Sequence, residues 1–150
     1  MHNWFECKVR YDKTLDTGMI KAVTEPYLVD AFSFTEAEAR IIEEIRPFIT
    51  GEFSIANIKR VKFSDTFFNE TGDRYFKAKL YYITLDEKSG TEKKTAVNML
   101  IQATTINEAL DTVEAEMKKT MIDYSIAAIT ETPIMDVFLY GEGGKTESKE

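Results

Sequence analysis

The stretch YLVDAFSFTEAEARIIEEI, residues 27–45, decides the fold of this chain. Its first part alternates between two kinds of side chain with a period of two, and this pattern predicts a half-buried strand over residues 20–32. Ser33 follows the strand, and Glu36 stands three residues further on. This spacing predicts a capping box, in which the two side chains accept backbone amides at the start of a helix.

The residues after the capping box predict an amphipathic helix. Ala37, Ile41 and Ile45 fall three to four residues apart, while glutamates occupy the positions between them. Pro47 and Gly51 mark the end of this pattern. We therefore expect a helix over about residues 34–48, apolar on one side and acidic on the other.

A weaker copy of this arrangement returns 71 or 72 residues later. Ser33 and Glu36 fall on Thr105 and Glu108, so a second capping box is expected there. The other matches keep their order: Phe5, Lys8 and Tyr11 fall on Phe76, Lys79 and Tyr82, and Ser54, Ile55 and Ala56 fall on Ser125, Ile126 and Ala127. We interpret the chain as an internal repeat, with chance similarity between two amphipathic segments as the alternative.

Each repeat reads as two strands, a helix and a strand, with a short extended piece at the end. The repeats cover about residues 4–68 and 75–140, and the connection between them is short. We predict an α+β fold of tandem ββαβ repeats with pseudo-two-fold symmetry, a mostly antiparallel sheet and two helices on one face. One fused sheet in a single domain over residues 1–140 is preferred to two separate domains, and residues 141–150 are expected to form a disordered tail.

Composition restricts the classes of protein to consider. The 150 residues carry a formal net charge of −7 and one cysteine, which cannot form an internal disulfide. No apolar run reaches the roughly 20 residues that span a bilayer, and the N-terminus does not resemble a signal peptide. We expect a cytoplasmic protein. The net charge argues against a broad nucleic-acid-binding surface but leaves room for a local basic patch.

No catalytic or metal-binding constellation is found in the sequence. His2 is the only histidine, and Cys7 lies at an inward position of the first strand, so neither a catalytic triad nor a zinc site is expected. Asp65 and Asp136 recur between the repeats and are interpreted as turn or cap residues. We predict a protein that is not an enzyme and has no metal or cofactor.

The side of the sheet away from the helices is the candidate binding face. Alternation along the strands places aromatic, basic and apolar residues on it together. They are Trp4, Lys8, Arg10 and Leu28 in the first repeat and Tyr75, Lys77, Lys79, Tyr81 and Leu100 in the second. We consider a protein partner first, including a second copy of the chain, and single-stranded nucleic acid second. Packing of these residues within the chain is the structural alternative to both functional interpretations, and the pattern favours it over either.

Four segments carry a resemblance to a known family. They are WFECKV at residues 4–9, TEPYLVDA at 24–31, EAEA at 36–39 and TETPIMD at 130–136. Together they resemble a family of short bacterial and phage proteins that is known only as a domain of unknown function. The resemblance covers about residues 3–140 and implies no activity, ligand or catalytic residue. The phage association slightly favours a role with nucleic acid or a host protein.

Overall fold

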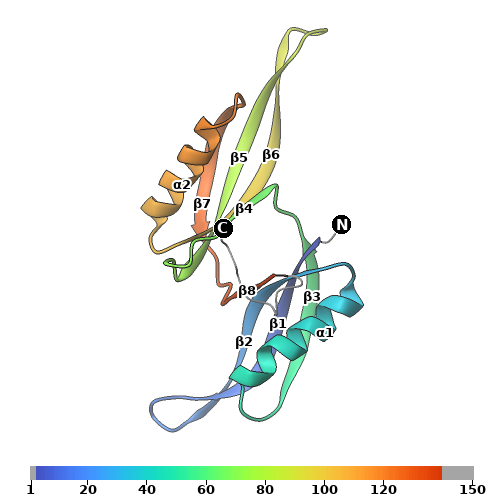
Figure 1. Cartoon of the computed structure of the whole chain (residues 1–150), viewed down its shortest axis with the longest axis vertical. Helices are drawn as coiled ribbons and strands as arrows, with labels where there is room; N and C mark the ends of the chain where they lie inside the picture. The colour runs from blue at the N-terminus through green and yellow to red at the C-terminus, as the bar shows by residue number, and fades with distance from the viewer. Residues whose placement is uncertain (1–2, 140–150) are drawn as a thin grey trace. The chain divides into compact units, whose positions relative to one another are not determined.

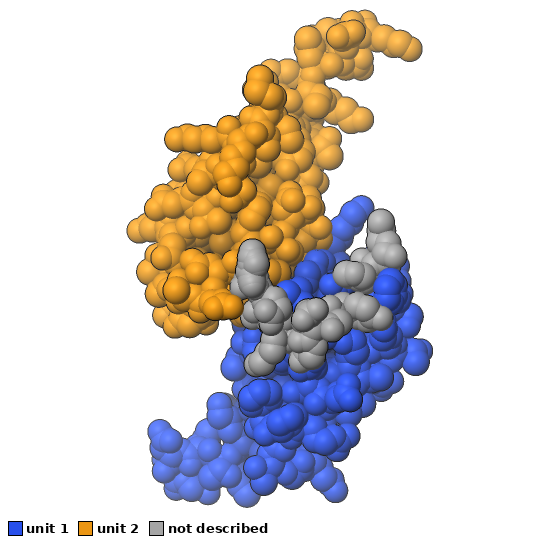
Figure 2. All heavy atoms as spheres, viewed as in Figure 1, with its two compact units in different colours: residues 1–62, 133–150 blue, residues 63–132 orange. Residues whose placement is uncertain are grey.

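A computed structural model describes residues 3–139 of the chain (Figure 1). The chain divides into two compact units, of which the first is built from two segments and the second is one continuous segment inserted between them in the sequence (Figure 2). Unit 1 comprises residues 1–62 and 133–150, and unit 2 comprises residues 63–132. His2 and the predicted tail at residues 141–150 lie outside the described residues.

Unit 1 contains a four-stranded sheet with one helix against it. Its strands are β1 (Asn3–Thr14), β2 (Ile20–Ala31), β3 (Phe53–Val61) and β8 (Val137–Phe138), in the order β3-β1-β2-β8. β1 is antiparallel to both of its neighbours, and β8 is parallel to β2. The helix α1 (Phe34–Ile45) continues into a 3-10 turn, η1 (Arg46–Phe48).

Unit 2 has the same architecture. Its strands are β4 (Asp65–Phe67), β5 (Arg74–Asp86), β6 (Thr91–Ala103) and β7 (Asp123–Glu131), in the order β4-β6-β5-β7. β5 is antiparallel to β6 and β7, and β4 is parallel to β6. The helix α2 (Ile106–Lys118) packs against β5, β6 and β7.

Each unit has its own hydrophobic core between the helix and one face of the sheet. The predicted helix positions Ala37, Ile41 and Ile45 are buried, as are their counterparts in α2. Inward-facing strand residues complete each core: Phe5, Cys7, Val9, Tyr27 and Val29 in unit 1, and Phe76, Ala78, Leu80, Met99 and Ile101 in unit 2. Helix and strand periodicities therefore converge on one apolar layer in each unit.

Both predicted capping boxes are confirmed. The Ser33 Oγ accepts the Glu36 amide at 3.1 Å, and the Glu36 carboxylate accepts the Phe32 amide. In unit 2 the Thr105 Oγ1 accepts the Glu108 amide at 3.1 Å, and the Glu108 carboxylate accepts the Thr104 amide. These bonds satisfy amides that have no partner inside the first helical turn.

The predicted fold class is confirmed, but the prediction of one fused sheet is wrong. The structure has two sheets of four strands each, and both are mostly antiparallel. The fourth strand of each sheet comes from the end of the other sequence repeat, since β4 follows β3 in the chain but pairs with β6, and β8 follows β7 but pairs with β2. The two repeats thus exchange their last strands.

Pro26 lies inside β2, where a proline leaves one backbone position without an amide donor. The Leu28 amide donates to the Asp136 carbonyl, so the backbone groups of Leu28, and of Pro26 two residues earlier, point away from β1. The Pro26 carbonyl accepts the Met135 amide at 2.8 Å. The missing amide of Pro26 therefore costs no hydrogen bond between β1 and β2.

Candidate binding surface

The helix-free face of unit 2, meaning the face of its sheet opposite α2, is the best-formed candidate surface. Lys77 and Lys79 are exposed on β5, and Tyr81 is half-buried next to them. The Lys79 Nζ lies 5.5 Å from the centroid of the Tyr81 ring, within the range of a cation–π contact. Lys94 on β6 lies opposite Ile83 and extends the same face.

No carboxylate lies directly across the sheet from these β5 residues. Their neighbours on β6 and β7 are Leu100 and Thr130 for Lys77, Asn98 and Ala128 for Lys79, and Ala96 and Ser125 for Tyr81. Since opposite-charge pairing across strands is absent at these positions, the two ammonium groups retain their positive potential toward solvent. We call Lys77, Lys79, Tyr81 and Lys94 the lysine patch.

The helix-free face of unit 1 has a mixed charge. Lys8 and Arg10 are exposed on β1, and Trp4 is half-buried near the start of that strand. Glu6 lies between Trp4 and Lys8 and forms an ion pair with Lys59 on β3, at 3.8 Å. The carboxylate weakens the positive potential here, so this face is a poorer site for an anion than the lysine patch.

Three of the nine predicted face residues are buried. Leu28 and Leu100 have exposed fractions of 0%, and Tyr75 has 4%. Leu28 lies between β1 and β8, and Leu100 lies between β5 and β4, so both belong to inner strands of their sheets. These three residues therefore offer no accessible surface to a partner, and the prediction that they contribute to a binding face is not supported.

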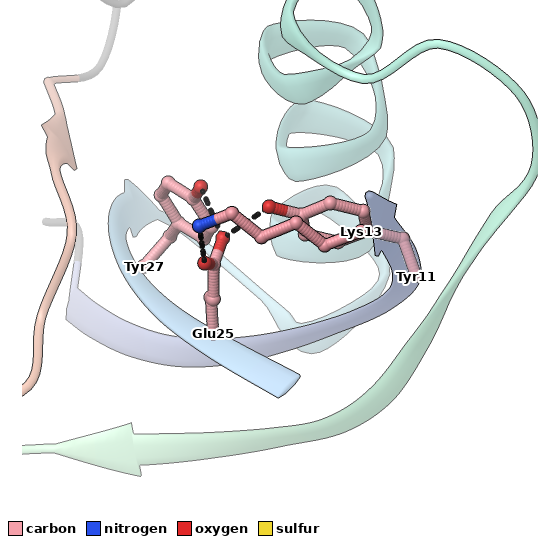
Figure 3. A network of polar contacts seen from close by, with 4 residues as sticks. All are labelled: Tyr11, Lys13, Glu25 and Tyr27. Carbon is pink, nitrogen blue, oxygen red and sulfur yellow. Dashed lines mark hydrogen bonds and ion pairs between the residues drawn. The ribbon is translucent and has the colours of Figure 1, made fainter. Parts of the chain in front are cut away.

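A polar network lies on the opposite, helix-covered side of the unit 1 sheet (Figure 3). Glu25 on β2 accepts hydrogen bonds from the hydroxyls of Tyr11, at 2.9 Å, and Tyr27, at 3.4 Å. The Lys13 Nζ lies 4.0 Å from the other carboxylate oxygen. Burial and the neighbouring Glu25 carboxylate raise the pKa values of Tyr11 and Tyr27. Both phenols are therefore protonated at neutral pH and act as hydrogen-bond donors.

The groups that the sequence considers for catalysis are in structural positions. Cys7 is fully buried, as predicted, and burial raises the pKa of its thiol to about 12, so it is a poor nucleophile. The Asp136 carboxylate accepts the Val137 amide at 2.8 Å, in agreement with a turn or cap role. Asp65 begins β4 on the surface. Among residues 3–139, no group of three or more metal-ligating side chains comes together.

An open hollow of about 410 Å³ lies between α1 and the start of β3. Glu38, Arg46 and Phe53 are among the residues that line it, and the Arg46 guanidinium lies 5.8 Å from the Phe53 ring centroid. Neither Asp65 nor Asp136 contributes to the lining. The hollow therefore does not combine with the recurring aspartates to form an acid–base site.

Comparison with known protein families identifies the family of this chain. The model of a domain of unknown function, DUF4494, matches residues 3–140. The chain belongs to this family. No curated protein matches the chain. Within the part of this DUF4494 chain that the structure describes, no helix is long and apolar enough to cross a membrane.

Sequence reasoning identified Lys77, Lys79 and Tyr81 but missed Lys94. The signal that places Lys94 is the register of the β5–β6 hairpin, in which Ile83 pairs with Lys94. Hairpin register depends on the turn, and here Asp86 and Thr91 form the pair that closes it. Counting from Gly90 would have placed Lys94 on the same face as Tyr81.

Proposed function

We propose that this DUF4494 protein is a non-enzymatic binding protein whose lysine patch binds single-stranded nucleic acid. The observation that carries the proposal is the exposed pair Lys77 and Lys79 beside the half-buried ring of Tyr81, with no carboxylate directly across the sheet. Ammonium groups next to a flat aromatic ring match the phosphates and bases of an unpaired strand.

The burial of the apolar residues changes the order of the two sequence-based hypotheses. The sequence favours a protein interface over nucleic acid because Trp4, Leu28, Tyr75 and Leu100 are expected to supply apolar surface. Tyr75 is also one of the rings on which bases would stack, so its burial removes it from both hypotheses. The two leucines are buried as well, and the accessible residues at the centre of the helix-free face of unit 2 are Lys77, Lys79 and Tyr81, whereas the exposed Leu85 lies near the hairpin end. A polyanion fits that chemistry better than an apolar protein surface does.

The helix-free face of unit 1 offers a weaker second contact for the same ligand. Lys8 and Arg10 are exposed, and Trp4 provides a larger ring, although Glu6 lies beside them. The resemblance to phage proteins agrees with a role on nucleic acid. The net charge of −7 repels phosphates elsewhere on the chain, so binding should be modest in strength and sensitive to salt.

Binding of a labelled oligothymidylate, measured by fluorescence anisotropy, tests the proposal. Affinity should fall as salt is raised from about 50 to 200 mM, because phosphate contacts release counterions. Replacing both Lys77→Glu and Lys79→Glu should remove two contacts and reduce the slope of log K against log salt by about 1.4. Tyr81→Leu should weaken binding without changing that slope, because it removes stacking and no charge.

The matched control carries Lys118→Glu and Lys119→Glu, which change the net charge equally at the exposed end of α2. This control should bind nearly as well as the wild type. Equal losses in both double variants would mean that only the net charge matters and would overturn the proposal, as would the absence of binding at about 50 mM salt. Equally tight, Tyr81-independent binding of polyglutamate would indicate an acidic protein partner instead.

A further inference from the structure

The long open edges of the two sheets differ in charge. β3 and β7 are the outermost strands in the sheet orders, and each spans nine residues. The opposite edges are formed by β8 and β4, which have two and three residues. Short edge strands are poor templates for further pairing, whereas a nine-residue edge offers a row of backbone amides and carbonyls.

The charges of the two long edges are complementary. β3 carries Lys59 and Arg60 and has no acidic residue between Phe53 and Val61. β7 carries Asp123 and Glu131 and has no basic residue between them. Lys59 is 63% exposed beside Glu6, and Glu131 is 53% exposed beside Arg74, so these two ion pairs reduce the edge charges without covering them. The β3 edge is still the more basic and the β7 edge the more acidic, which favours contact of β3 with β7 over contact between like edges.

The shapes of the two edges also match, because β3 and β7 are equivalent strands of the repeat. Each has one bulged alanine, Ala56 or Ala127, at the shift in its pairing with the central strand. Each has half-buried isoleucines three residues apart, at positions 55 and 58 and at positions 126 and 129. Side by side and antiparallel, the strands would keep both helices on the same side of the joined sheet and place isoleucine next to isoleucine on the helix-covered face.

We propose that copies of this chain associate head to tail, with the β3 edge of one copy paired to the β7 edge of another. The antiparallel arrangement places the Lys59–Arg60 end of β3 next to Asp123 at the start of β7. The contact is heterologous, so each copy keeps one free edge of each charge and the assembly can grow beyond a dimer. This inference does not depend on the proposed binding of nucleic acid.

Sedimentation velocity of the full chain at increasing concentration, without nucleic acid, tests the inference. The average mass should rise with concentration, and the rise should weaken in high salt, which screens the edge charges.

A first variant, Lys59→Glu with Lys62→Glu, makes the end of β3 acidic. It keeps Arg60, which contacts the rings of Phe5 and Phe34. A second variant, Asp123→Lys with Glu131→Lys, makes β7 basic. Each should associate about tenfold more weakly than the wild type.

Mixing the two variants provides the decisive comparison. The first variant keeps a native β7 edge and the second keeps a native β3 edge, so a mixture should associate more tightly than either variant alone. Circular dichroism checks that both are folded. Control chains with Lys118→Glu and Lys119→Glu, or with Asp111→Lys and Glu114→Lys on α2, should associate like the wild type. A wild type that keeps the mass of one chain at all concentrations, or variants that do not associate on mixing, would overturn the inference.

Discussion

Unit 1 and unit 2 share strand order, helix caps and a bulged edge, but the polar content of their cores is different. At three equivalent inward positions unit 1 has Cys7, Glu25 and Tyr27, whereas unit 2 has Ala78, Val97 and Met99. Unit 1 thus places a carboxylate under its helix-covered face and satisfies it with tyrosine hydroxyls, while unit 2 fills the same space with apolar side chains.

The comparison separates what the fold requires from what it tolerates. Features that recur in both units, such as the capping boxes and the exchanged fourth strands, are needed to build a ββαβ unit of this kind. Features that occur once, such as the Glu25 network and the lysine patch, are free to vary and are the places to look for a property of one unit alone. Each prediction below tests one side of this division.

The largest expected effect concerns the exchanged strands. Phe138 on β8 is 4% exposed, and its ring stacks on Tyr27 with centroids 6.0 Å apart. Phe138→Ala should lower the free energy of unfolding of unit 1 by about 3–5 kcal/mol, because it leaves a cavity in the core. Its counterpart Phe67 on β4 is half-buried, so Phe67→Ala should cost unit 2 less. Urea unfolding followed by Trp4 fluorescence reports on unit 1, and circular dichroism reports on both units.

The matched control for Phe138→Ala is Met135→Ala, since Met135 precedes β8 and is 52% exposed. It should change stability by no more than about 0.5 kcal/mol. If Phe138→Ala left the Trp4 transition unchanged, β8 would not contribute to the stability of unit 1 in solution, and the strand exchange would lose its energetic basis.

The exchange itself could not be predicted from the sequence. The repeat correctly indicates that Asp65–Phe67 and Asp136–Phe138 are equivalent, and both segments form short strands. The sequence does not indicate which sheet each strand joins, because Leu28–Val29 and Leu100–Ile101 present nearly the same apolar partner. The choice depends on the path of the short connection after β3 or β7, which leaves no periodic signal in the sequence.

An intermediate effect is expected when the Glu25 network of unit 1 is made to resemble unit 2. Glu25→Val should lower the stability of unit 1 by about 1–3 kcal/mol, because the buried Tyr27 hydroxyl loses its acceptor. Tyr11 is half-buried and can bond to water instead. Combining Glu25→Val with Tyr27→Phe removes both donor and acceptor and should recover most of the loss. A double-mutant cycle in urea, followed by Trp4 fluorescence, measures the coupling.

Alkaline titration provides an independent check of this network. The pKa of Tyr27 is raised in the folded state, so its contribution to stability is complete below the unfolded pKa of about 10 and is lost as pH rises through the folded value. The wild type should therefore lose stability above about pH 10 more steeply than the Glu25→Val, Tyr27→Phe variant. Equal slopes would show that the pKa of Tyr27 is not raised in the folded state.

The sequence predicted only part of the candidate surface, and the buried residues show why. Alternation along β5 correctly placed Lys77, Lys79 and Tyr81 on the helix-free face. The same alternation placed Leu28, Tyr75 and Leu100 on that face but gave no information on whether they are covered. A period of two identifies the side of a strand, and burial depends on neighbouring strands that are distant in the sequence.

The smallest expected effect concerns the capping boxes, where the two units should respond alike. Ser33→Ala removes the acceptor of the Glu36 amide, and Thr105→Ala removes that of the Glu108 amide. Each should lower the stability of its unit by about 1 kcal/mol. Thr35→Ala, an exposed position in the first turn of α1, should leave stability nearly unchanged. Urea unfolding measures all three.

A clear loss of stability for one cap and none for the other would mean that the first turns of α1 and α2 differ in solution. The two capping bonds have equal geometry, so unequal losses imply that one helix start frays. The capping box would then belong with the features that only one unit needs.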